Sequence, residues 1–246
     1  MRSPIRMAVL GLLVLLSACN QDAANTPADA KTNTVAASTP SAKDWTKTVV
    51  VTPEGGYRMG NPKAAVTLVE YGSLTCPHCA DFTAKSAPVL IGQYVKSGKL
   101  SFEFRNFVRD PVDLTAALLS RCSTPAAYFK LNDQLFANQT TMIEQMQKTP
   151  QPELEKMGKL QPAELLPALA KVTGLDRFVA ARGISETQAR SCLTNKAAQD
   201  QLIAIRTQAI DKYKLSGTPT FLLNGQTVDG VFDWPSLQTK LQATLG

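Results

Sequence analysis

Histidine is almost absent from this chain, with His78 the single one among 246 residues. Zinc and copper sites rely largely on histidine and cysteine, and the five cysteines lack the paired spacing of a tetrahedral zinc site. Methionine-rich tracts, which a copper carrier would add, are also missing, and only Met142, Met146 and Met157 come close to one. We therefore expect no metal and no other cofactor.

Clustered positive charge is a second absence. The formal net charge is +6, but the lysines and arginines are scattered among acidic residues. A nucleic-acid surface needs cations gathered on one face with aromatic side chains between them. The charge is therefore a solubility feature first, and we expect no nucleic-acid partner.

The amino terminus lacks an apolar run long enough to span a bilayer comfortably, because the run there covers only residues 7–16. Two arginines precede it and small residues follow, which is typical of an export signal. The four residues Leu16-Ser17-Ala18-Cys19 resemble the lipobox of bacterial lipoproteins. This resemblance implies a signal peptide over residues 1–18, a lipid on Cys19 and a membrane-anchored periplasmic protein. An ordinary signal peptide followed by a chance cysteine is the alternative.

Large apolar residues are almost missing from residues 20–42. A stretch of alanine, threonine, serine, asparagine, aspartate and proline buries too little surface to offset the entropy of ordering it. We expect residues 19–44 to be a flexible tether that lets a lipid-anchored domain stand off the membrane.

The cysteines that are present divide into groups, because disulfides persist in an oxidising compartment outside the cytosol. With Cys19 assigned to lipid, Cys76 and Cys79 form a C-x-x-C, and Cys122 and Cys192 remain as one further possible pair. Two free buried thiols at positions 122 and 192 are the alternative.

Ordered sequence begins near Trp45 with strand, helix and strand patterns. After a short strand at residues 49–51, a β-rich apolar run over residues 64–71 predicts a buried strand, and apolar residues then recur at helical spacing over residues 77–96. Residues 100–108 alternate apolar and polar side chains, which predicts a second strand. This order favours a parallel pair with a right-handed crossover.

The middle of the chain lacks strand patterns, and helix starts recur there instead. They are expected at Asp113, Thr124, Gln161 and Ser185. Strand patterns resume at residues 219–223 and 226–228, joined by Asn224-Gly225, which is the strongest short signal for a hairpin turn. A closing helix is expected over residues 234–245.

Without the central helices, the order βαβ and then ββα remains, which is the element order of a thioredoxin fold. We predict an α/β protein, a thioredoxin fold with an inserted all-helical domain. The thioredoxin-like domain is expected over residues 45–110 and 214–246, and the inserted helical domain over residues 111–213.

The C-x-x-C lies where the predicted strand ends and the helix begins. There the sulfur of Cys76 meets free N–H groups and the positive end of the helix dipole, which favour its thiolate. Pro77 suits the first helical position, and the imidazole of His78 is expected to lower the pKa of Cys76 further. A stabilised thiolate makes the Cys76–Cys79 disulfide oxidising.

Two other uses of a C-x-x-C fit poorly. Covalent haem attachment needs a histidine directly after the second cysteine, and that residue is Ala80. A purely structural disulfide gains little from closing so short a loop.

The motif Cys76-Pro77-His78-Cys79, with Leu68-Val69-Glu70-Tyr71 before it and Gly217-Thr218-Pro219-Thr220-Phe221 after it, resembles the DsbA family of bacterial periplasmic oxidases. The resemblance implies that Glu70, six residues before the nucleophile, is a buried acid that assists proton transfer from Cys79. A Glu facing a sheet edge is the alternative. It also implies that Pro219 is a cis-proline and that Thr218 hydrogen-bonds extended substrate backbone. Some related proteins carry a non-catalytic disulfide comparable to a Cys122–Cys192 pair.

The resemblance further implies a periplasmic thiol:disulfide oxidoreductase that oxidises cysteine pairs in reduced, unfolded exported proteins. A DsbB-like membrane quinone reductase would reoxidise it, and we expect a monomer. Thr218 stands where the enteric oxidase has valine, and threonine is also found there in isomerases. A disulfide isomerase, or a reductant for a dedicated partner, is therefore the first alternative. A non-catalytic thiol-based metal or peptide binding module is an alternative of another class.

Overall fold

The structure of the protein is a computed structural model, and it describes residues 43–246. The expected signal peptide, Cys19 and nearly all of the expected tether lie outside the described residues. Asp44, the last residue of that tether, caps the short 3-10 helix η1 (Trp45–Lys47) by accepting the N–H of Thr46. Within the described part, no helix combines the length and apolar character needed to cross a bilayer.

One mixed sheet organises residues 43–246, with its strands in the order β1-β2-β4-β3-β5-β6. β3 and β4 are parallel, and the other neighbouring pairs are antiparallel. The strands are β1 (Val49–Val51), β2 (Tyr57–Gly60), β3 (Val66–Gly72), β4 (Leu100–Asn106), β5 (Thr220–Leu223) and β6 (Gln226–Thr227).

Strand β2 has no counterpart in the sequence prediction. It pairs with β1 on one side and with β4 on the other. A turn at Gly55 and Gly56 closes the hairpin, with the N–H of Thr52 bonded to the carbonyl of Gly56 at 2.9 Å. A strand of four residues that ends in a glycine is too short for an alternating pattern to stand out, and its pairing with β4 joins residues more than 40 positions apart in the sequence.

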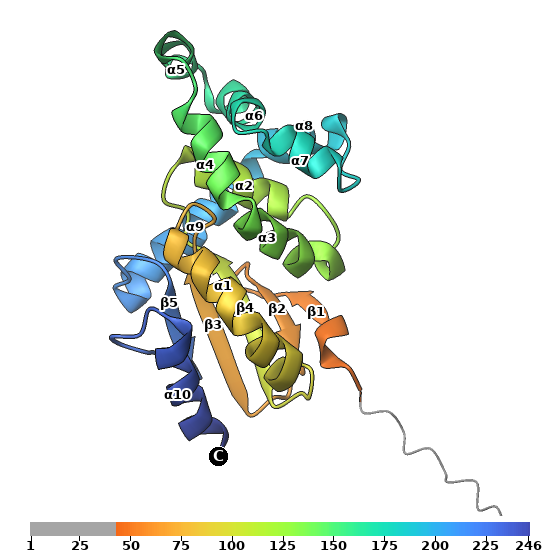
Figure 1. Ribbon diagram of the computed structural model, residues 1–246, viewed down its shortest axis with the longest axis vertical. Helices are drawn as coiled ribbons and strands as arrows, with labels where there is room; N and C mark the ends of the chain where they lie inside the picture. Colours follow the sequence, from red (N-terminus) through yellow and green to blue (C-terminus); the bar gives the residue numbers. More distant parts are fainter. Residues whose placement is uncertain (1–42) are drawn as a thin grey trace, which may run out of the picture. The chain divides into compact units, whose positions relative to one another are not determined.

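The helices are α1 (Pro77–Val89), the π-helical turn η2 (Leu90–Val95), α2 (Pro111–Ser120), the 3-10 turn η3 (Pro125–Ala127), α3 (Tyr128–Ala137), α4 (Gln139–Gln147), α5 (Gln151–Met157), α6 (Pro162–Val172), α7 (Leu175–Ala180), α8 (Glu186–Thr194), α9 (Lys196–Tyr213) and α10 (Trp234–Leu245). α2 to α9 are inserted between β4 and β5, so the sheet is completed only after the helical segment (Figure 1).

The helix expected over residues 77–96 is not one regular α-helix. It contains Pro88, which has no N–H to donate, and it changes to a π-helical turn at Leu90. A proline inside a helix removes one backbone hydrogen bond and crowds the preceding turn, so the next hydrogen bonds shift register. The spacing of apolar residues that predicted the helix gives no sign of this change from α-helix to π-helix.

Helices cover both faces of the sheet. On one face, Phe221 of β5 packs against Phe82 of α1, with ring centroids 4.6 Å apart, and Phe82 also contacts Trp234 of α10. On the other face, Tyr71 of β3 contacts Tyr213 of α9. Consecutive strand residues point to opposite faces, so Glu70 lies on the α1 face and Tyr71 on the α9 face.

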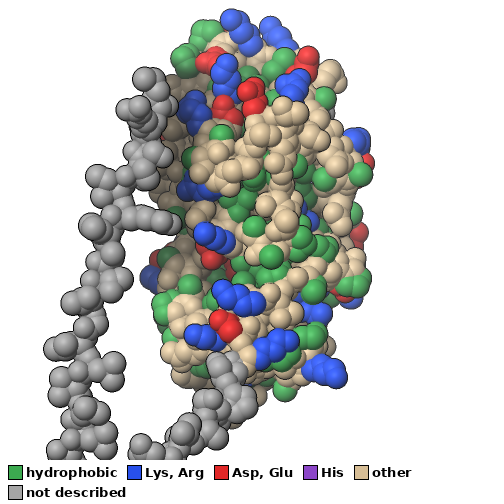
Figure 2. Space-filling model, turned by 90° about the vertical axis from the view of Figure 1, so that its right-hand side faces the viewer, with side chains coloured by type: hydrophobic (Ala, Val, Ile, Leu, Met, Phe, Trp, Pro, Cys, Tyr) green, Lys and Arg blue, Asp and Glu red, His purple; other side chains and the backbone are tan. Residues whose placement is uncertain are grey.

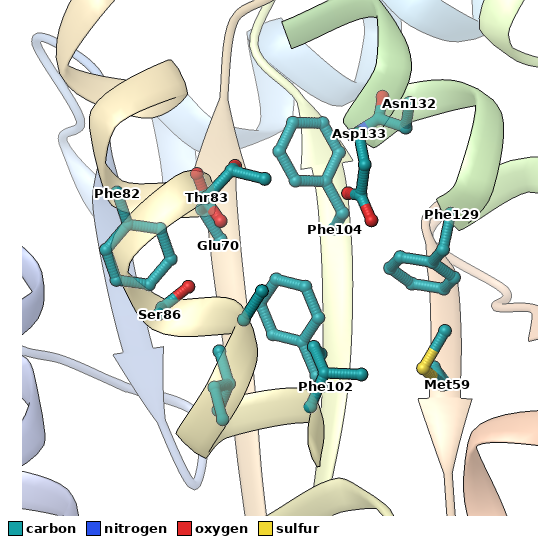
Figure 3. Close-up of a pocket in the computed structure, with 13 residues that line it drawn as sticks. Met59, Glu70, Phe82, Thr83, Ser86, Phe102, Phe104, Phe129, Asn132 and Asp133 are labelled. Atoms are coloured by element: carbon teal, nitrogen blue, oxygen red, sulfur yellow. The ribbon is translucent and has the colours of Figure 1, made fainter. Parts of the chain in front are cut away.

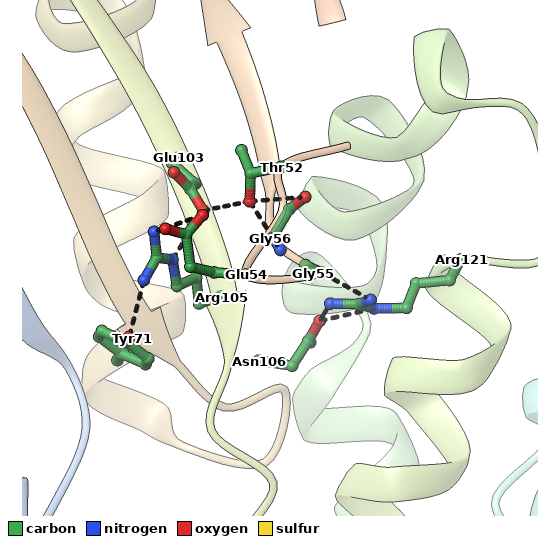
Figure 4. Close-up of polar contacts among 9 residues, drawn as sticks. All are labelled: Thr52, Glu54, Gly55, Gly56, Tyr71, Glu103, Arg105, Asn106 and Arg121. Atoms are coloured by element: carbon green, nitrogen blue, oxygen red, sulfur yellow. Dashed lines mark hydrogen bonds and ion pairs between the residues drawn. The ribbon is translucent and has the colours of Figure 1, made fainter. Parts of the chain in front are cut away.

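A buried polar network ties the α9 face of β4 to the hairpin turn (Figure 4). The Nε of Arg105 lies 2.6 Å from Oε1 of Glu103, and its Nη1 donates to the Tyr71 hydroxyl at 2.9 Å. Thr52 donates to the same Glu103 oxygen at 2.7 Å. A Cβ at Gly56 would stand too close to that oxygen, so only glycine fits there. The network satisfies charges that would otherwise be costly to bury.

The helical segment is cross-linked by a disulfide. Cys122, just after α2, is bonded to Cys192 of α8, and Gln188 of α8 donates to the carbonyl of Cys122 at 2.7 Å. The structure therefore does not contain the two free thiols of the alternative.

On the face shown in Figure 2, positive and negative side chains are interspersed and do not gather into a basic stripe.

Candidate active site

Cys76 lies after the end of β3 and immediately before the first residue of α1. Its backbone is extended, with φ −91° and ψ 117°, and Pro77 follows at the first helical position. The N–H groups of Cys79 and Ala80 bond to the Cys76 carbonyl at 3.1 and 3.2 Å and close the first turn. The sulfur of Cys76 is also affected by the backbone N–H groups of His78 and Cys79, at the end of the helix where an anion is favoured.

The pKa of Cys76 is lowered to about 5. The main cause is a hydrogen bond from the Cys79 thiol, and burial opposes it. The Thr218 hydroxyl and the backbone N–H groups of Cys79 and His78 add to the lowering. As a thiol, Cys76 donates to the Thr218 carbonyl at 3.2 Å, and the Thr218 hydroxyl is buried without a partner among the described residues. When Cys76 ionises, its sulfur can accept a hydrogen bond from the Thr218 hydroxyl.

Cys79 has the opposite character. It is fully buried, and burial is the largest cause that raises its pKa well above the ordinary value for a thiol. Its hydrogen bond to Cys76 and the charge of Glu70 raise the pKa further. One sulfur of the pair is therefore held as an anion and the other as a thiol, which divides the pair into a nucleophile and a proton carrier.

Glu70 lies on β3, which is a central strand between β4 and β5. Its side chain is 1% exposed, so the alternative of a glutamate facing a sheet edge is wrong. One carboxylate oxygen, Oε1, has no hydrogen-bond partner among the described residues. Burial raises the pKa of Glu70 well above its usual range, and the charges of Asp133 and Cys76 add to this effect.

The segment opposite the nucleophile contains the Thr218–Pro219 peptide bond, which is cis. Thr220 donates its hydroxyl to the Gly217 carbonyl at 2.8 Å and holds the turn before β5. β5 pairs with β3, so this segment lies beside the end of β3, where Cys76 follows. The pairing brings Thr218 and Cys76 together across 142 residues of sequence.

Pro77 and His78 are both exposed at the start of α1. His78 acts on the Cys76 sulfur through its backbone N–H. The effect of its imidazole on that sulfur stays a prediction.

The loop before Cys76 is held by an acidic residue whose role the sequence prediction missed. Asp113 was expected to start a helix, but Asp110 is the residue that caps α2. Asp113 is instead fully buried, and its carboxylate accepts the N–H of Leu74 at 2.8 Å and the N–H of Arg109 at 2.9 Å. Burial raises the pKa of Asp113 to about 7. The Asp-Pro-x-Asp pattern indicates a helix start, but it does not show which of the two carboxylates caps the helix and which accepts hydrogen bonds from the loop before Cys76.

Gln139, the first residue of α4, makes the second contact to this loop. Its Nε2 donates to the carbonyls of Leu74 at 2.9 Å and of Cys76 at 3.0 Å. Asp113 and Gln139 both belong to the helical segment, so that segment positions the backbone of the nucleophile. No local signal distinguishes Gln139 from a solvated glutamine at a helix start.

The methionines weighed against a copper-binding alternative are packing residues and not part of this site. Within residues 43–246, no group of three or more histidine, cysteine, aspartate or glutamate side chains is placed to hold a metal ion. Met142 and Met157 are buried in the core, and Met146 packs against it. These methionines therefore serve as packing residues of the helical segment.

Three comparisons with known proteins agree on the family. The thioredoxin family model matches residues 52–243. A putative protein-disulfide oxidoreductase of Rickettsia typhi is 29% identical over 167 residues, which are 68% of this chain and 54% of the relative. The chain thus spans about half the length of the curated relatives it matches.

Solved structures also resemble this one. The protein-disulfide isomerase of Novosphingobium aromaticivorans has 36% identity and a TM-score of 0.73, with 77% of this chain and 96% of that chain covered. The α-DsbA1 of Wolbachia pipientis has 24% identity and a TM-score of 0.61, with 80% and 93% covered, and it supports the fold. The prediction of a thioredoxin fold with inserted helices is confirmed. The chain belongs to the thioredoxin family.

Proposed function

We propose that this protein oxidises cysteine pairs in reduced, unfolded exported proteins through a Cys76–Cys79 disulfide. The observation that carries the proposal is the opposite ionisation of the two sulfurs. The pKa of Cys76 is lowered to about 5, while that of Cys79 is raised well above its usual value. A stabilised thiolate stabilises the reduced enzyme, so the disulfide form gains electrons readily.

The reaction proceeds in two exchanges. A substrate thiolate attacks the sulfur of Cys76, the Cys76–Cys79 bond breaks, and its electron pair leaves on Cys79, which takes up a proton. The second substrate thiolate then attacks the substrate sulfur of the mixed disulfide, and Cys76 leaves as a thiolate. Two electrons pass to the enzyme, and one disulfide forms in the substrate.

The remaining parts of the proposal concern location and partners. A lipid on Cys19 would anchor the protein to a bacterial membrane from the periplasmic side, with residues 19–44 as a tether. A DsbB-like quinone reductase would take the two electrons from the reduced pair. Thr218 and Pro219, beside the nucleophile, would receive the extended backbone of the substrate.

The experiment compares two single-atom changes in the full-length chain. Cys79→Ser is expected to trap a mixed disulfide with a model peptide dimer linked by a disulfide, because the Cys76 thiolate attacks that bond, releases one peptide as a thiol and then has no second thiol to resolve it. Cys76→Ser is expected to trap none and to lose oxidation of the reduced peptide. Mass spectrometry under non-reducing conditions reads both. Alkylation of Cys76 as a function of pH is expected to show a midpoint near pH 5. Equal peptide oxidation by the wild type and Cys76→Ser would refute the proposal.

A disulfide isomerase is the second candidate, and two observations favour it. Threonine precedes the cis-proline, and the solved relative with 36% identity is described as a protein-disulfide isomerase. An isomerase would restore activity to a model protein with scrambled disulfides, in the absence of any oxidant, at a rate comparable to its oxidation of dithiols. An oxidase would oxidise dithiols much faster than it rearranges wrong disulfides.

A further inference from the structure

A small cavity lies between α1 and α3 above the α1 face of the sheet, and it is called the α1–α3 cavity below (Figure 3). Its volume is about 40 Å³. A single water needs roughly 10–15 Å³ of such space, so the cavity has room for more than one water. Apolar side chains form most of its walls, but Glu70 of β3 and Asn132 and Asp133 of α3 also line it.

Two buried oxygens in this lining lack hydrogen-bond partners among the described residues. They are Oε1 of Glu70 and Oδ1 of Asn132, on side chains that are 1% and 2% exposed. A buried acceptor without a donor costs about 1–3 kcal/mol, so native proteins usually satisfy it with ordered water. Glu70 and Asn132 both line one space large enough for water, so cavity water is a donor available to both side chains.

Asp133 connects this cavity to solvent. The residue is exposed, yet it also lines the cavity, and Figure 3 shows its carboxylate directed into the space between α1 and α3. Asp133 is therefore the titratable side chain that reaches both the bulk solvent and the cavity beside Glu70. Its pKa is raised to about 6 by desolvation, which places its proton exchange near neutral pH.

Proton balance explains why such a connection matters. In the first exchange of the proposed reaction, Cys79 leaves with an electron pair and takes up one proton, because its pKa lies far above neutral pH. Cys79 is fully buried, so solvent does not reach its sulfur directly. Glu70 acts electrostatically on Cys79 and is the acid expected to supply that proton. Glu70 must then regain a proton from outside the core.

We propose that Asp133 and the α1–α3 cavity form the route by which protons pass between solvent and Glu70. The inference rests on the proposed oxidoreductase function and adds one residue of the helical segment to it. Asp133 is a positioning and relay residue, because it acts on the sulfurs only through Glu70. When Cys79 gains its proton, the carboxylate of Glu70 takes one from Asp133 by way of cavity water, and Asp133 takes one from solvent.

The titratable groups that act on Glu70 come from two elements. Asp133 belongs to α3 and Cys76 begins α1, and both raise the pKa of Glu70. Glu70 in turn raises the pKa values of Cys79 in α1 and of Tyr128 in α3. Among these groups Asp133 is the one with a pKa near 6, so a rate profile with an inflection there reports on it.

The test is Asp133→Asn in the full-length chain, with the rate of disulfide reduction by a model dithiol measured against pH. General acid–base catalysis accelerates reactions roughly 10²–10⁴-fold. Because the variant loses a carboxylate one group beyond Glu70, we expect the reaction to be about tenfold slower and the inflection near pH 6 to disappear. Small acids such as formate are expected to restore the variant's rate in proportion to their concentration while leaving the wild type unchanged. Asp133→Glu is expected to keep the inflection.

Asp81→Asn is the matched control, because Asp81 is an exposed aspartate of α1 that pairs with Lys85 and does not line the cavity. Asn132→Leu is a second variant that fills the cavity and removes one acceptor, and we expect it to slow the same step without rescue by formate. The equilibrium with glutathione depends on the end states and not on the route that the proton takes, so we expect it to change far less than the rate in Asp133→Asn. An unchanged rate profile in Asp133→Asn would overturn the inference, whereas a wild type that oxidises no dithiol would overturn the proposed function.

Discussion

At the scale of single residues, burial sets the chemistry more than neighbouring charge does. Burial is the first cause of the raised pKa values of Glu70, Cys79 and Asp113. Cys76 differs because donors reach its sulfur, so hydrogen bonding outweighs burial there. Groups of equal chemistry therefore take different protonation states according to whether the structure supplies a donor.

Glu70 yields a prediction about stability. Its folded pKa lies above the unfolded value, so its contribution is neutral below the unfolded pKa and becomes unfavourable as the pH rises toward the folded pKa. We expect Glu70→Gln in the oxidised protein to be more stable than the wild type at pH 8, by at least about 1 kcal/mol, because a buried unpaired charge costs more than that. At pH 4 the two should be equally stable.

Urea unfolding at both pH values measures the difference. The same variant should slow dithiol oxidation, since the amide that replaces the carboxyl group has no acidic proton to transfer, so stability and activity are expected to change in opposite directions. A wild type that is the more stable of the two at pH 8 would show that Glu70 is paired and ionised in the folded protein.

At the scale of elements, the inserted helices hold the loop between β3 and α1 that leads to Cys76. α2 supplies Asp113 and α4 supplies Gln139, and each contacts the backbone between β3 and α1. The first turn of α1 is thereby fixed from outside its own βαβ unit. This placement gives the helical segment a direct part in orienting Cys76, in addition to any contact with substrates.

Gln139→Leu tests this positioning. The change keeps the size of the side chain but leaves the carbonyls of Leu74 and Cys76 without their donor. We expect a loss of about 1–3 kcal/mol in the free energy of unfolding and slower alkylation of Cys76 at pH 6. Gln147→Leu makes the same replacement at an exposed position of α4 and should change neither quantity. If both variants behaved alike, the contact would have no positioning role.

At the scale of the whole molecule, the long insertion needs constraints that local helix formation does not supply. The Cys122–Cys192 disulfide closes a loop of 70 residues within it. Arg121 adds a second constraint, since its guanidinium donates to Asn106 of β4 and to the carbonyl of Gly55. The helical segment and the sheet are therefore linked close to the point where the chain leaves β4.

Removing the disulfide should lower stability without removing the chemistry. In the chain-entropy model, closing a loop of 70 residues contributes roughly 4 kcal/mol. We expect the double variant Cys122→Ala/Cys192→Ala to have a free energy of unfolding lower by about that amount, and therefore to unfold at a lower denaturant concentration. The pH midpoint of Cys76 alkylation should stay the same. Denaturant titration and alkylation measure the two effects. A variant as stable as the wild type would show that packing alone holds the insertion together.

The sequence by itself determined the features that depend on short separations. Cys76 and Cys79 lie on one helical turn at a strand end, and Asn224-Gly225 forms a hairpin turn with φ of 49° and 80°, as the residue types require. Local geometry decides such features, so the C-x-x-C, the closing helix and the βαβ and ββα patterns on either side of the insertion could be predicted from neighbouring residues. Recognition of Glu70 and Pro219 needed a family resemblance in addition.

Only the tertiary structure decided which polar side chains are buried and what they face. β2 is too short to show a strand pattern in the sequence. In the sequence alone, Gln139, Asp113 and Asp133 look like ordinary solvated residues of helices. Each acquires its role by meeting a segment 39 or more residues away, as Asp113 meets Leu74 and Gln139 meets Cys76. Burial depends on the packing of the whole chain, so the ionisation that drives the site could not be assigned from any local pattern.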